Sequence, residues 1–168
     1  MKTLIIGDTH FDDKNTALRN AQLQAAETLY EQARVQGCDR VVFLGDVFDK
    51  RKPSPACILD VKEFFDNVQI PTVIIRGNHD SATKSDDGVT ILSLLHRDGV
   101  VEVFNRWEHR GSHLYLSHFE NESVLKEVLA EDWPDDLRLP DCFCNLMGEH
   151  AARGALPHLG FQLGLPKE

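Results

Sequence analysis

The chain has 168 residues, 42% of them hydrophobic and 27% charged, which is the composition of a soluble globular protein of one domain. Its formal net charge of −9 argues against a broad basic surface for nucleic acid, although bound divalent cations would add positive charge that a residue count omits. No apolar run is long enough to span a bilayer, and the apolar start of the chain runs directly into acidic residues, unlike a secretion signal. These features predict a cytoplasmic protein without a membrane segment, in which the four cysteines form no disulfides.

Short apolar strands alternate with helices over the first part of the chain. Buried strands are expected at Thr3–Gly7, Arg40–Leu44 and Pro71–Ile75. Apolar residues at helical spacing between positions 18 and 33 predict a helix that Gly37 ends, and a second helix is expected to begin at Ser54-Pro55. Strands and helices in this order predict a parallel sheet with helices packed on it, and therefore an α/β fold.

The second half of the chain is less regular. Strands are expected at Val100–Phe104, His113–Ser117 and Cys142–Met147, a polar turn at Asn105–Gly111 and a helix at Glu122–Glu131. The stretch Ala151–Glu168 is punctuated by glycine and proline and keeps no period. We therefore expect one domain over residues 1–150, followed by an irregular tail over residues 151–168.

Polar side chains follow each of the first three expected strands. The clusters are Asp8-Thr9-His10, Gly45-Asp46 and Gly77-Asn78-His79-Asp80. Because parallel strands end at the same edge of a sheet, residues far apart in the sequence should meet there. Each has a plainer interpretation when taken alone: Asp8 as a cap, Asn78 as a turn residue, and His79 as an exposed polar side chain. Three such clusters, each directly after a strand, favour a shared site instead.

The residue types in these clusters favour divalent metal ions. Carboxylate, imidazole and amide oxygen ligands suit manganese, iron or zinc, and two such ions roughly 3.5–4 Å apart can share a bridging carboxylate. Asp46 is the expected bridge, because Gly45 lets the chain turn tightly where its strand ends. Asp8 and His10 would hold the first ion, and Asn78 the second.

The order Asp-x-His, Gly-Asp, Gly-Asn-His-Asp resembles the calcineurin-like metallophosphoesterase superfamily. The segment Gly45–Pro55 is similar to the SbcD-type nucleases, the catalytic subunits of double-strand-break repair complexes, including phage homologues. The resemblance implies a metallophosphoesterase-type fold of β-sheet layers flanked by helices. It also implies a hydrolase that uses two divalent ions, with Mn²⁺ as the first choice and Fe²⁺ or Zn²⁺ as alternatives.

Matched residue by residue, the resemblance implies a ligand set for these two ions. The first ion would be bound by Asp8, His10 and Asp46. The second would be bound by Asp46 and Asn78, together with His118, which follows a strand in Leu116-Ser117-His118.

The last motif of the family is altered in this chain. Gly-His-x-His is replaced by Gly148-Glu149-His150-Ala151, so one histidine remains and it is displaced by one position. Glu149 would replace an imidazole as an oxygen ligand, and His150 would reach one ion after local rearrangement. A site that lacks a ligand would bind metal more weakly, so this stretch bears directly on activity.

The resemblance also implies roles in catalysis and substrate binding. His79 matches the residue that contacts the scissile phosphate and assists the leaving oxygen, and Asp80 would hold the His79 ring in one orientation. Arg51 and Arg76 lie beside the motif loops and are candidates for phosphate contacts. For the run Lys50-Arg51-Lys52, a solvated charged turn is an equally good interpretation.

The leading hypothesis is hydrolysis of phosphodiester bonds in DNA, in recombination or repair. The resemblance adds an ATPase partner subunit, but we expect no room in this chain for the family's DNA-capping domain or its ATPase-binding segment. The first alternative is a small phosphodiesterase or phosphatase acting on nucleotides or phosphoproteins, which the acidic charge favours. The second is a catalytically impaired remnant that acts as a binding module, which the altered Gly148-Glu149-His150 stretch favours.

Overall fold

The computed structural model describes residues 2–7, 9–77, 79–80, 90–110 and 113–115. Their centre is a four-stranded sheet of β1 (Thr3–Ile6), β2 (Arg40–Phe43), β3 (Thr72–Ile75) and β4 (Val101–Phe104), in that order from edge to edge. Every neighbouring pair of strands is parallel. This sheet confirms the predicted α/β fold, and each of the four strands lies within one residue of its predicted bounds.

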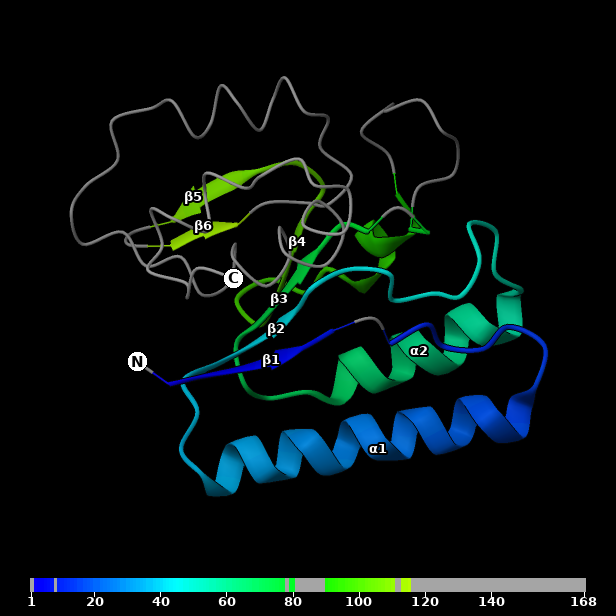
Figure 1. Ribbon diagram of the computed structural model, residues 1–168, viewed down its shortest axis with the longest axis horizontal. Coiled ribbons are helices and arrows are strands. Elements are labelled where there is room, and N and C mark those ends of the chain that lie inside the picture. The colour runs from blue at the N-terminus through cyan, green and yellow to red at the C-terminus, as the bar shows by residue number, and fades with distance from the viewer. Residues whose placement is uncertain (1, 8, 78, 81–89, 111–112, 116–168) are drawn as a thin grey trace, which may run out of the picture.

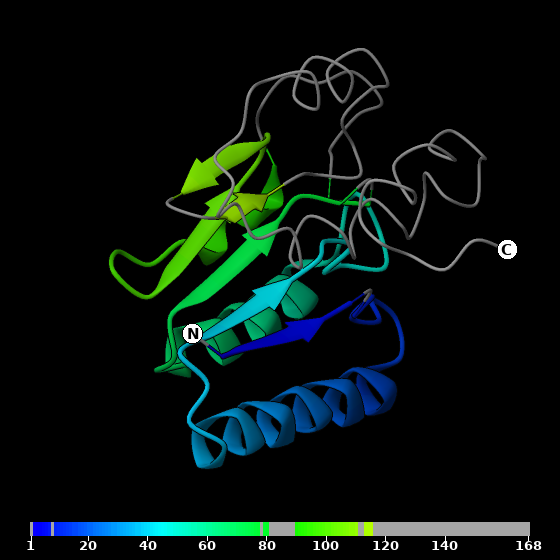
Figure 2. The same ribbon diagram turned by 60° about the vertical axis from the view of Figure 1, so that its left-hand side comes forward.

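Two helices cover one face of this sheet. The helix α1 (Thr16–Val35) connects β1 to β2, and α2 (Pro55–Asn67) connects β2 to β3. Both lie on the same side of the sheet (Figure 1), and the turned view in Figure 2 shows the same arrangement. Right-handed crossovers between parallel strands that are added in chain order place successive helices on one face.

Both helices begin where a side chain caps them. The Asn15 side-chain oxygen accepts a hydrogen bond from the Leu18 amide at 3.1 Å, and the Ser54 hydroxyl accepts one from the Cys57 amide at 3.3 Å. After α1, Gly37 adopts a left-handed φ of 64°, as expected of a residue that ends a helix. The predicted start of α2 at Ser54-Pro55 and the predicted end of α1 before Gly37 are therefore confirmed.

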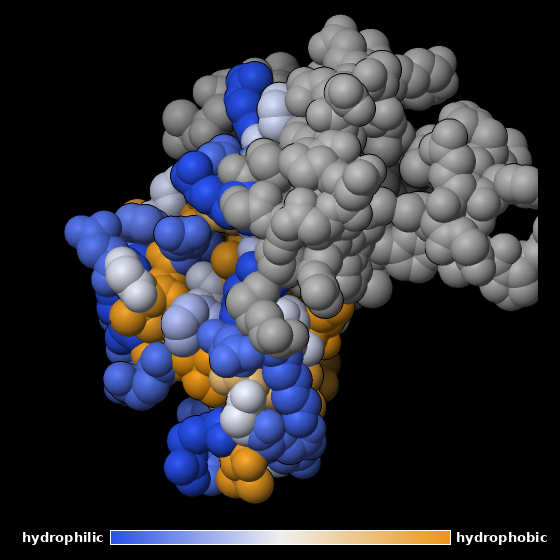
Figure 3. All heavy atoms as spheres, turned by 90° about the vertical axis from the view of Figure 1, so that its left-hand side faces the viewer, coloured by the Kyte–Doolittle hydropathy of each residue, from blue (hydrophilic) through white to orange (hydrophobic). Residues whose placement is uncertain are grey.

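Alternate strand residues face two hydrophobic clusters. The cluster between sheet and helices includes Val41, Phe43, Ile74, Val101, Tyr30, Phe64 and Phe65. The cluster on the other face consists of Val42, Val73, Ile75, Phe104 and Tyr115. Figure 3 views the molecule from the end at which the strands begin, where hydrophobic residues lie among hydrophilic ones. A sheet that is buried on both faces explains why its strands are continuous apolar runs rather than alternating ones.

An antiparallel pair of short strands follows the sheet. The strand β5 (Glu108–Arg110) pairs with β6 (His113–Tyr115). The predicted polar turn at Asn105–Gly111 is therefore wrong over residues 108–110. These residues show no apolar alternation, and they form a strand because β6 supplies a partner. Tyr115 anchors the pair by packing on Phe104, with ring centroids 5.0 Å apart.

Other expected elements have mixed outcomes. The strand expected at His113–Ser117 is present as far as Tyr115, whereas the expected helix at Glu122–Glu131, the strand at Cys142–Met147 and the tail at 151–168 lie outside the described residues. A 3-10 helix, η1 (Ile91–Leu95), was not predicted, because five residues are too few to show a period. Neither α1 nor α2, the two long helices of the described part, is apolar enough over sufficient length to cross a membrane.

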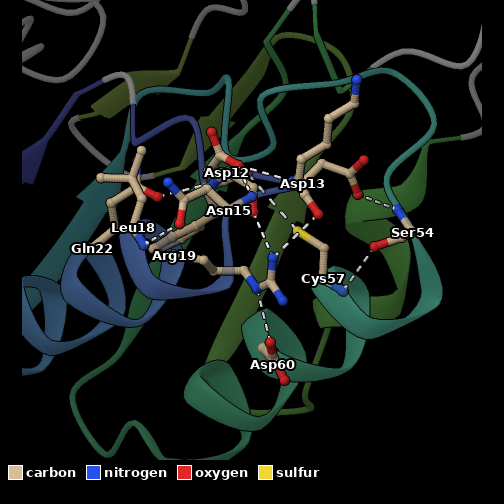
Figure 4. Close-up of polar contacts among 11 residues, drawn as sticks. Asp12, Asp13, Asn15, Leu18, Arg19, Gln22, Ser54, Cys57 and Asp60 are labelled. Atoms are coloured by element: carbon tan, nitrogen blue, oxygen red, sulfur yellow. Dashed lines mark hydrogen bonds and ion pairs between the residues drawn. The ribbon is translucent and has the colours of Figure 1, made fainter.

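The loop after β1 is fastened to both helices by polar contacts (Figure 4). Asp13 accepts a hydrogen bond from the Ser54 amide at 2.5 Å and pairs with the Lys50 ammonium at 3.3 Å. Arg19, of which only 2% is exposed, pairs with Asp60 of α2 through Nε at 2.8 Å. Because Arg19 of α1 also donates to the Asp12 carbonyl at 2.7 Å, these contacts connect the first motif loop to α1 as well as to the start of α2.

The loops after β2 and β3 cross very closely at Gly45. Its φ is 100°, and a Cβ added there would lie 2.7 Å from the Gly77 nitrogen, 2.8 Å from the Gly77 Cα and 3.0 Å from the Ile75 carbonyl oxygen. All three neighbours are backbone atoms, which cannot move aside as a flexible side chain would. Gly45 therefore permits the close approach of the second and third motif loops, in addition to the tight turn expected from the sequence.

The Asp13 anchor should make stability depend on pH. The pKa of Asp13 is held below its ordinary value of 3.8, chiefly by the hydrogen bond from the Ser54 amide and then by the Ser54 and Lys50 side chains. Because its pKa is lower in the folded state, Asp13 contributes to the free energy of unfolding above its unfolded pKa. This contribution is lost as the pH falls through the folded-state pKa. We expect Asp13→Asn to lower the free energy of unfolding by roughly 1 kcal/mol at pH 7, with the difference shrinking below about pH 4. Urea titrations at pH 7 and below about pH 4 measure this difference. The control is Glu63→Gln, at an exposed position, which should behave like wild type.

The Gly45 crossing should not tolerate a side chain. We expect Gly45→Ala to lower the free energy of unfolding by about 2–4 kcal/mol, because the clash with Gly77 adds to the unfavourable left-handed φ. Gly99→Ala is the matched control: its φ is 73°, but no atom lies within 4 Å of the added Cβ, so only the conformational cost applies. Equal losses in the two variants, measured by chemical denaturation, would show that the crossing is unimportant.

Candidate metal centre

The first two motif loops run side by side beyond the ends of their strands. The His10 amide donates to the Asp46 carbonyl and the Phe11 amide to the Val47 carbonyl, each at 2.9 Å. Phe11 also forms a parallel bridge with Phe48. The parallel hydrogen bonding between β1 and β2 thus continues beyond the strands. It places the first two motif loops next to each other at the carboxyl edge of the sheet, where the sequence predicted that they would meet.

Both predicted ligands that the structure describes in these loops have an unusual backbone. His10 has a φ of 42° and Asp46 a φ of 47°, and these are the two non-glycine residues in the described part with a positive φ. A residue with a Cβ is disfavoured in this region by about 1–3 kcal/mol, so it persists only where the surroundings enforce it. Such strain is concentrated at functional sites, and here it occurs at both described candidates for metal binding.

The two side chains converge. His10 Nε2 lies 3.9 Å from Asp46 Oδ2, with 35% of the His10 side chain and 8% of the Asp46 side chain exposed. The other carboxylate oxygen of Asp46, Oδ1, accepts a hydrogen bond from the His79 amide at 2.8 Å. The His10 and His79 rings are 4.9 Å apart between centroids and nearly perpendicular, at 89°. One oxygen of Asp46 therefore fixes the third motif loop, while the other faces His10.

This geometry fits a divalent ion shared by His10 and Asp46. A separation of 3.9 Å is too long for a hydrogen bond but is less than twice the bond length of about 2.0–2.2 Å that imidazole and carboxylate make to such ions. No cluster of three or more histidine, cysteine, aspartate or glutamate side chains is found among the described residues. Five further predicted ligands lie outside them: Asp8, Asn78, His118, Glu149 and His150.

The His79 ring is oriented by a backbone carbonyl. Its Nδ1 lies 2.8 Å from the Asp49 carbonyl oxygen, which can only accept a hydrogen bond, so Nδ1 must carry a proton. In the neutral ring Nε2 is then left as the acceptor, and in the protonated ring it becomes a second donor. Sequence reasoning missed Asp49 in this role, because a carbonyl is common to all residues and leaves no signal in the residue type.

Asp80 contacts the backbone of two motif loops. It was expected to orient the His79 ring, and that role stays a prediction; its described hydrogen bonds are to backbone amides. Its Oδ1 accepts from Val47 at 3.0 Å and from Phe48 at 3.3 Å, and its Oδ2 accepts from Gly77 at 2.9 Å. The side chain is completely buried. Asp80 therefore ties the second motif loop to the third.

The two candidate phosphate-binding arginines differ. Arg76 is completely buried, and its Nη1 donates to the Asn105 carbonyl at 3.4 Å while its amide donates to the Phe104 carbonyl at 3.0 Å. These contacts pack the third motif loop against the end of β4, and the predicted contact of Arg76 with phosphate stays a prediction. Arg51 is partly exposed in the loop between β2 and α2, and its predicted contact with phosphate stays a prediction.

The chain is similar to known phosphoesterases. The family model for calcineurin-like phosphoesterases matches residues 1–160. The DNA double-strand break repair protein Mre11 of Archaeoglobus fulgidus is 28% identical over 139 residues, covering 78% of this chain and 31% of Mre11. The chain thus spans about a third of the length of this relative.

A solved structure, the nuclease MPE of Pseudomonas putida, is 19% identical to this chain, with a TM-score of 0.45, and the match covers 68% of this chain and 52% of the nuclease. The family model extends over nearly the whole chain and includes all three motif clusters. The chain therefore belongs to the calcineurin-like phosphoesterase family.

Proposed function

We propose that the chain is a divalent-metal-dependent phosphodiesterase and that DNA is its substrate. The observation that carries the proposal is the convergence of His10 and Asp46, on strained backbone from two motif loops, with the His79 ring beside them. Membership in a family of phosphoesterases supports the reaction class. The relative Mre11, which is described as a DNA double-strand break repair protein, supports the choice of DNA.

The proposed cofactor is a pair of divalent ions, with Mn²⁺ as the first choice. His10 and Asp46 would hold one ion, and Asp46 would bridge to the second. The sequence adds Asp8 and Asn78, and the resemblance adds His118, with Glu149 and the displaced His150 in place of the family's two histidines. When bound, such ions polarise the phosphoryl oxygens and offset the negative charge that develops on them.

His79 is the proposed proton donor to the leaving oxygen. Because its Nδ1–H is held by the Asp49 carbonyl, the Nε2–H of the protonated ring is available for substrate. Transfer of this proton to the leaving oxygen, as a water oxygen bonds to phosphorus and the bond from phosphorus to the leaving oxygen breaks, would prevent the release of an alkoxide. The ring becomes neutral in this step and regains a proton from water before the next turnover.

The biological setting is part of the proposal. The resemblance supports a role in recombination or repair and an ATPase partner subunit, whereas the sequence pattern supports a cytoplasmic location and a catalytic domain over residues 1–150. Arg51, beside the second motif loop, would contact substrate phosphates. The net charge of −9 favours a smaller competing substrate, such as a nucleotide phosphodiester, which the assay below includes.

The Asp46 carboxylate should be essential for activity. We expect Asp46→Asn to reduce manganese-dependent cleavage of linear duplex DNA by at least about 100-fold, because the amide removes a charged ligand while keeping the shape. Circular dichroism verifies the fold, and Asp98→Asn, at a fully exposed side chain, is the control. Turnover by Asp46→Asn at the wild-type rate would refute the bridging role. Cleavage of bis(p-nitrophenyl) phosphate without cleavage of DNA would instead favour the small-substrate alternative.

A substitution can distinguish two roles of Asp80, joining the motif loops and orienting the His79 ring. Asp80→Asn places an amide N–H against backbone N–H groups in a buried position, so we expect the free energy of unfolding to fall by about 2–3 kcal/mol. Activity should fall as well, because Asp46 and His79 lose their fixed relation. Urea unfolding and DNA cleavage are measured together. Unchanged stability with lost activity would support the ring-orienting role that the sequence predicted.

A further inference from the structure

The first motif loop is held by a side chain from outside all three motifs. Gln22, in the second turn of α1 and labelled in Figure 4, contacts the backbone of this loop at three points. Its Nε2 donates to the Thr9 carbonyl at 3.2 Å and to the His10 carbonyl at 3.0 Å, and its Oε1 accepts from the Asp12 amide at 2.9 Å. An amide side chain offers two N–H donors and one acceptor oxygen, and Gln22 uses both kinds of group on this loop.

The two carbonyls that Gln22 binds lie on either side of the His10 Cα. The Thr9 carbonyl belongs to the peptide plane before the His10 Cα, and the His10 carbonyl belongs to the plane after it. Because peptide planes are rigid, only φ and ψ of His10 can change the relation between these two oxygens. A single nitrogen that binds both oxygens keeps them close together and so restricts the combinations of φ and ψ open to His10, whose φ of 42° is unfavourable.

Arg19 extends the same contact along the loop. It lies three residues before Gln22 and so on the same face of α1. Its Nη1 donates to the carbonyls of Asp12, at 2.7 Å, and Asp13, at 3.3 Å, while its Nε pairs with Asp60 of α2. Two adjacent side chains of α1 thus bind four carbonyls of the loop that carries His10, and the pair is itself fastened to the second helix.

We propose that Gln22 is a positioning residue for the metal ligand His10, acting by holding its backbone in the left-handed region. The part of this proposal that concerns metal rests on the proposed function, whereas the part that concerns the backbone of His10 does not. A side chain that only anchored the start of α1 would need the Asp12 contact alone. The hydrogen bonds from the Gln22 amide to the Thr9 and His10 carbonyls are needed only if Gln22 also positions His10.

Three variants separate these roles. Gln22→Met keeps the length of the side chain and removes all three contacts, whereas Gln22→Glu keeps an acceptor for the Asp12 amide and removes both donors. Gln24→Met is the matched control, because Gln24 is an exposed residue of the same helix. Val101→Ala, in the core at the far end of the sheet, controls for a general loss of stability.

The first measurement is hydrogen exchange at the His10 and Phe11 amides of the whole chain without metal. These amides bond to the carbonyls of Asp46 and Val47, not to Gln22, so their exchange reports on the conformation of the loop. We expect exchange to be about tenfold faster in both Gln22 variants and unchanged in Gln24→Met, with any increase in Val101→Ala spread over the whole sheet. Wild-type exchange in both Gln22 variants overturns the proposal, as does an increase in Gln22→Met without one in Gln22→Glu.

The second measurement is titration with Mn²⁺ by calorimetry. Removing a group that orients a ligand typically weakens metal affinity by about 10–100-fold, and we expect at least about tenfold in both Gln22 variants. Unchanged affinity would overturn the link to the metal. If the wild-type chain itself bound no Mn²⁺, the proposed function would fail, and the exchange rates would still decide whether Gln22 fixes the backbone of His10.

Discussion

A buried carboxylate holds the motif loops in register. Asp80 is removed from water, and a charge in that position is stable only when hydrogen bonds replace its solvation. The donors that replace it are the amides of Val47, Phe48 and Gly77, which belong to two different loops. The requirement to satisfy one charge therefore sets the distance between those loops, and the contact between the His79 amide and Asp46 depends on it.

The sheet and its two helices support loops whose backbone conformations are unfavourable. The sheet and its two helices bury apolar residues on both faces of the strands, which is the main source of stability in an α/β protein. The loops at the carboxyl edge contain two residues with Cβ atoms in the left-handed region and a glycine at a crossing of two backbones. Their conformations are maintained by hydrogen bonds from neighbouring loops and from α1, so the centre is shaped by contacts that the hydrophobic core alone would not provide.

Local patterns were sufficient to predict the sheet, both long helices and the meeting of the motif loops. Buried parallel strands are short apolar runs, helix caps have preferred residue types, and the edge at which parallel strands end follows from topology. The strand β5 could not be predicted in this way, because Glu108–Arg110 has no pattern of its own and depends on β6.

The contacts within the site were less predictable than its residues. Asp49 acts through a carbonyl that every residue has, and Gln22 looks like any polar residue on a helix. The burial of Arg76 against β4 was likewise not predictable from its charge and its place beside a motif loop. In each case the deciding factor is tertiary packing, which neither residue type nor spacing encodes.

The hydrogen bonds from α1 to the first motif loop have a consequence for protein design. The three motifs are short enough to be copied into the loops of another parallel sheet, and such a graft would carry His10 and Asp46 in the correct order. It would leave behind the glutamine and arginine of α1, without which the grafted histidine would relax to a right-handed or extended backbone and turn its ring away. The smallest portable unit of this centre is therefore a loop together with the helix that follows it.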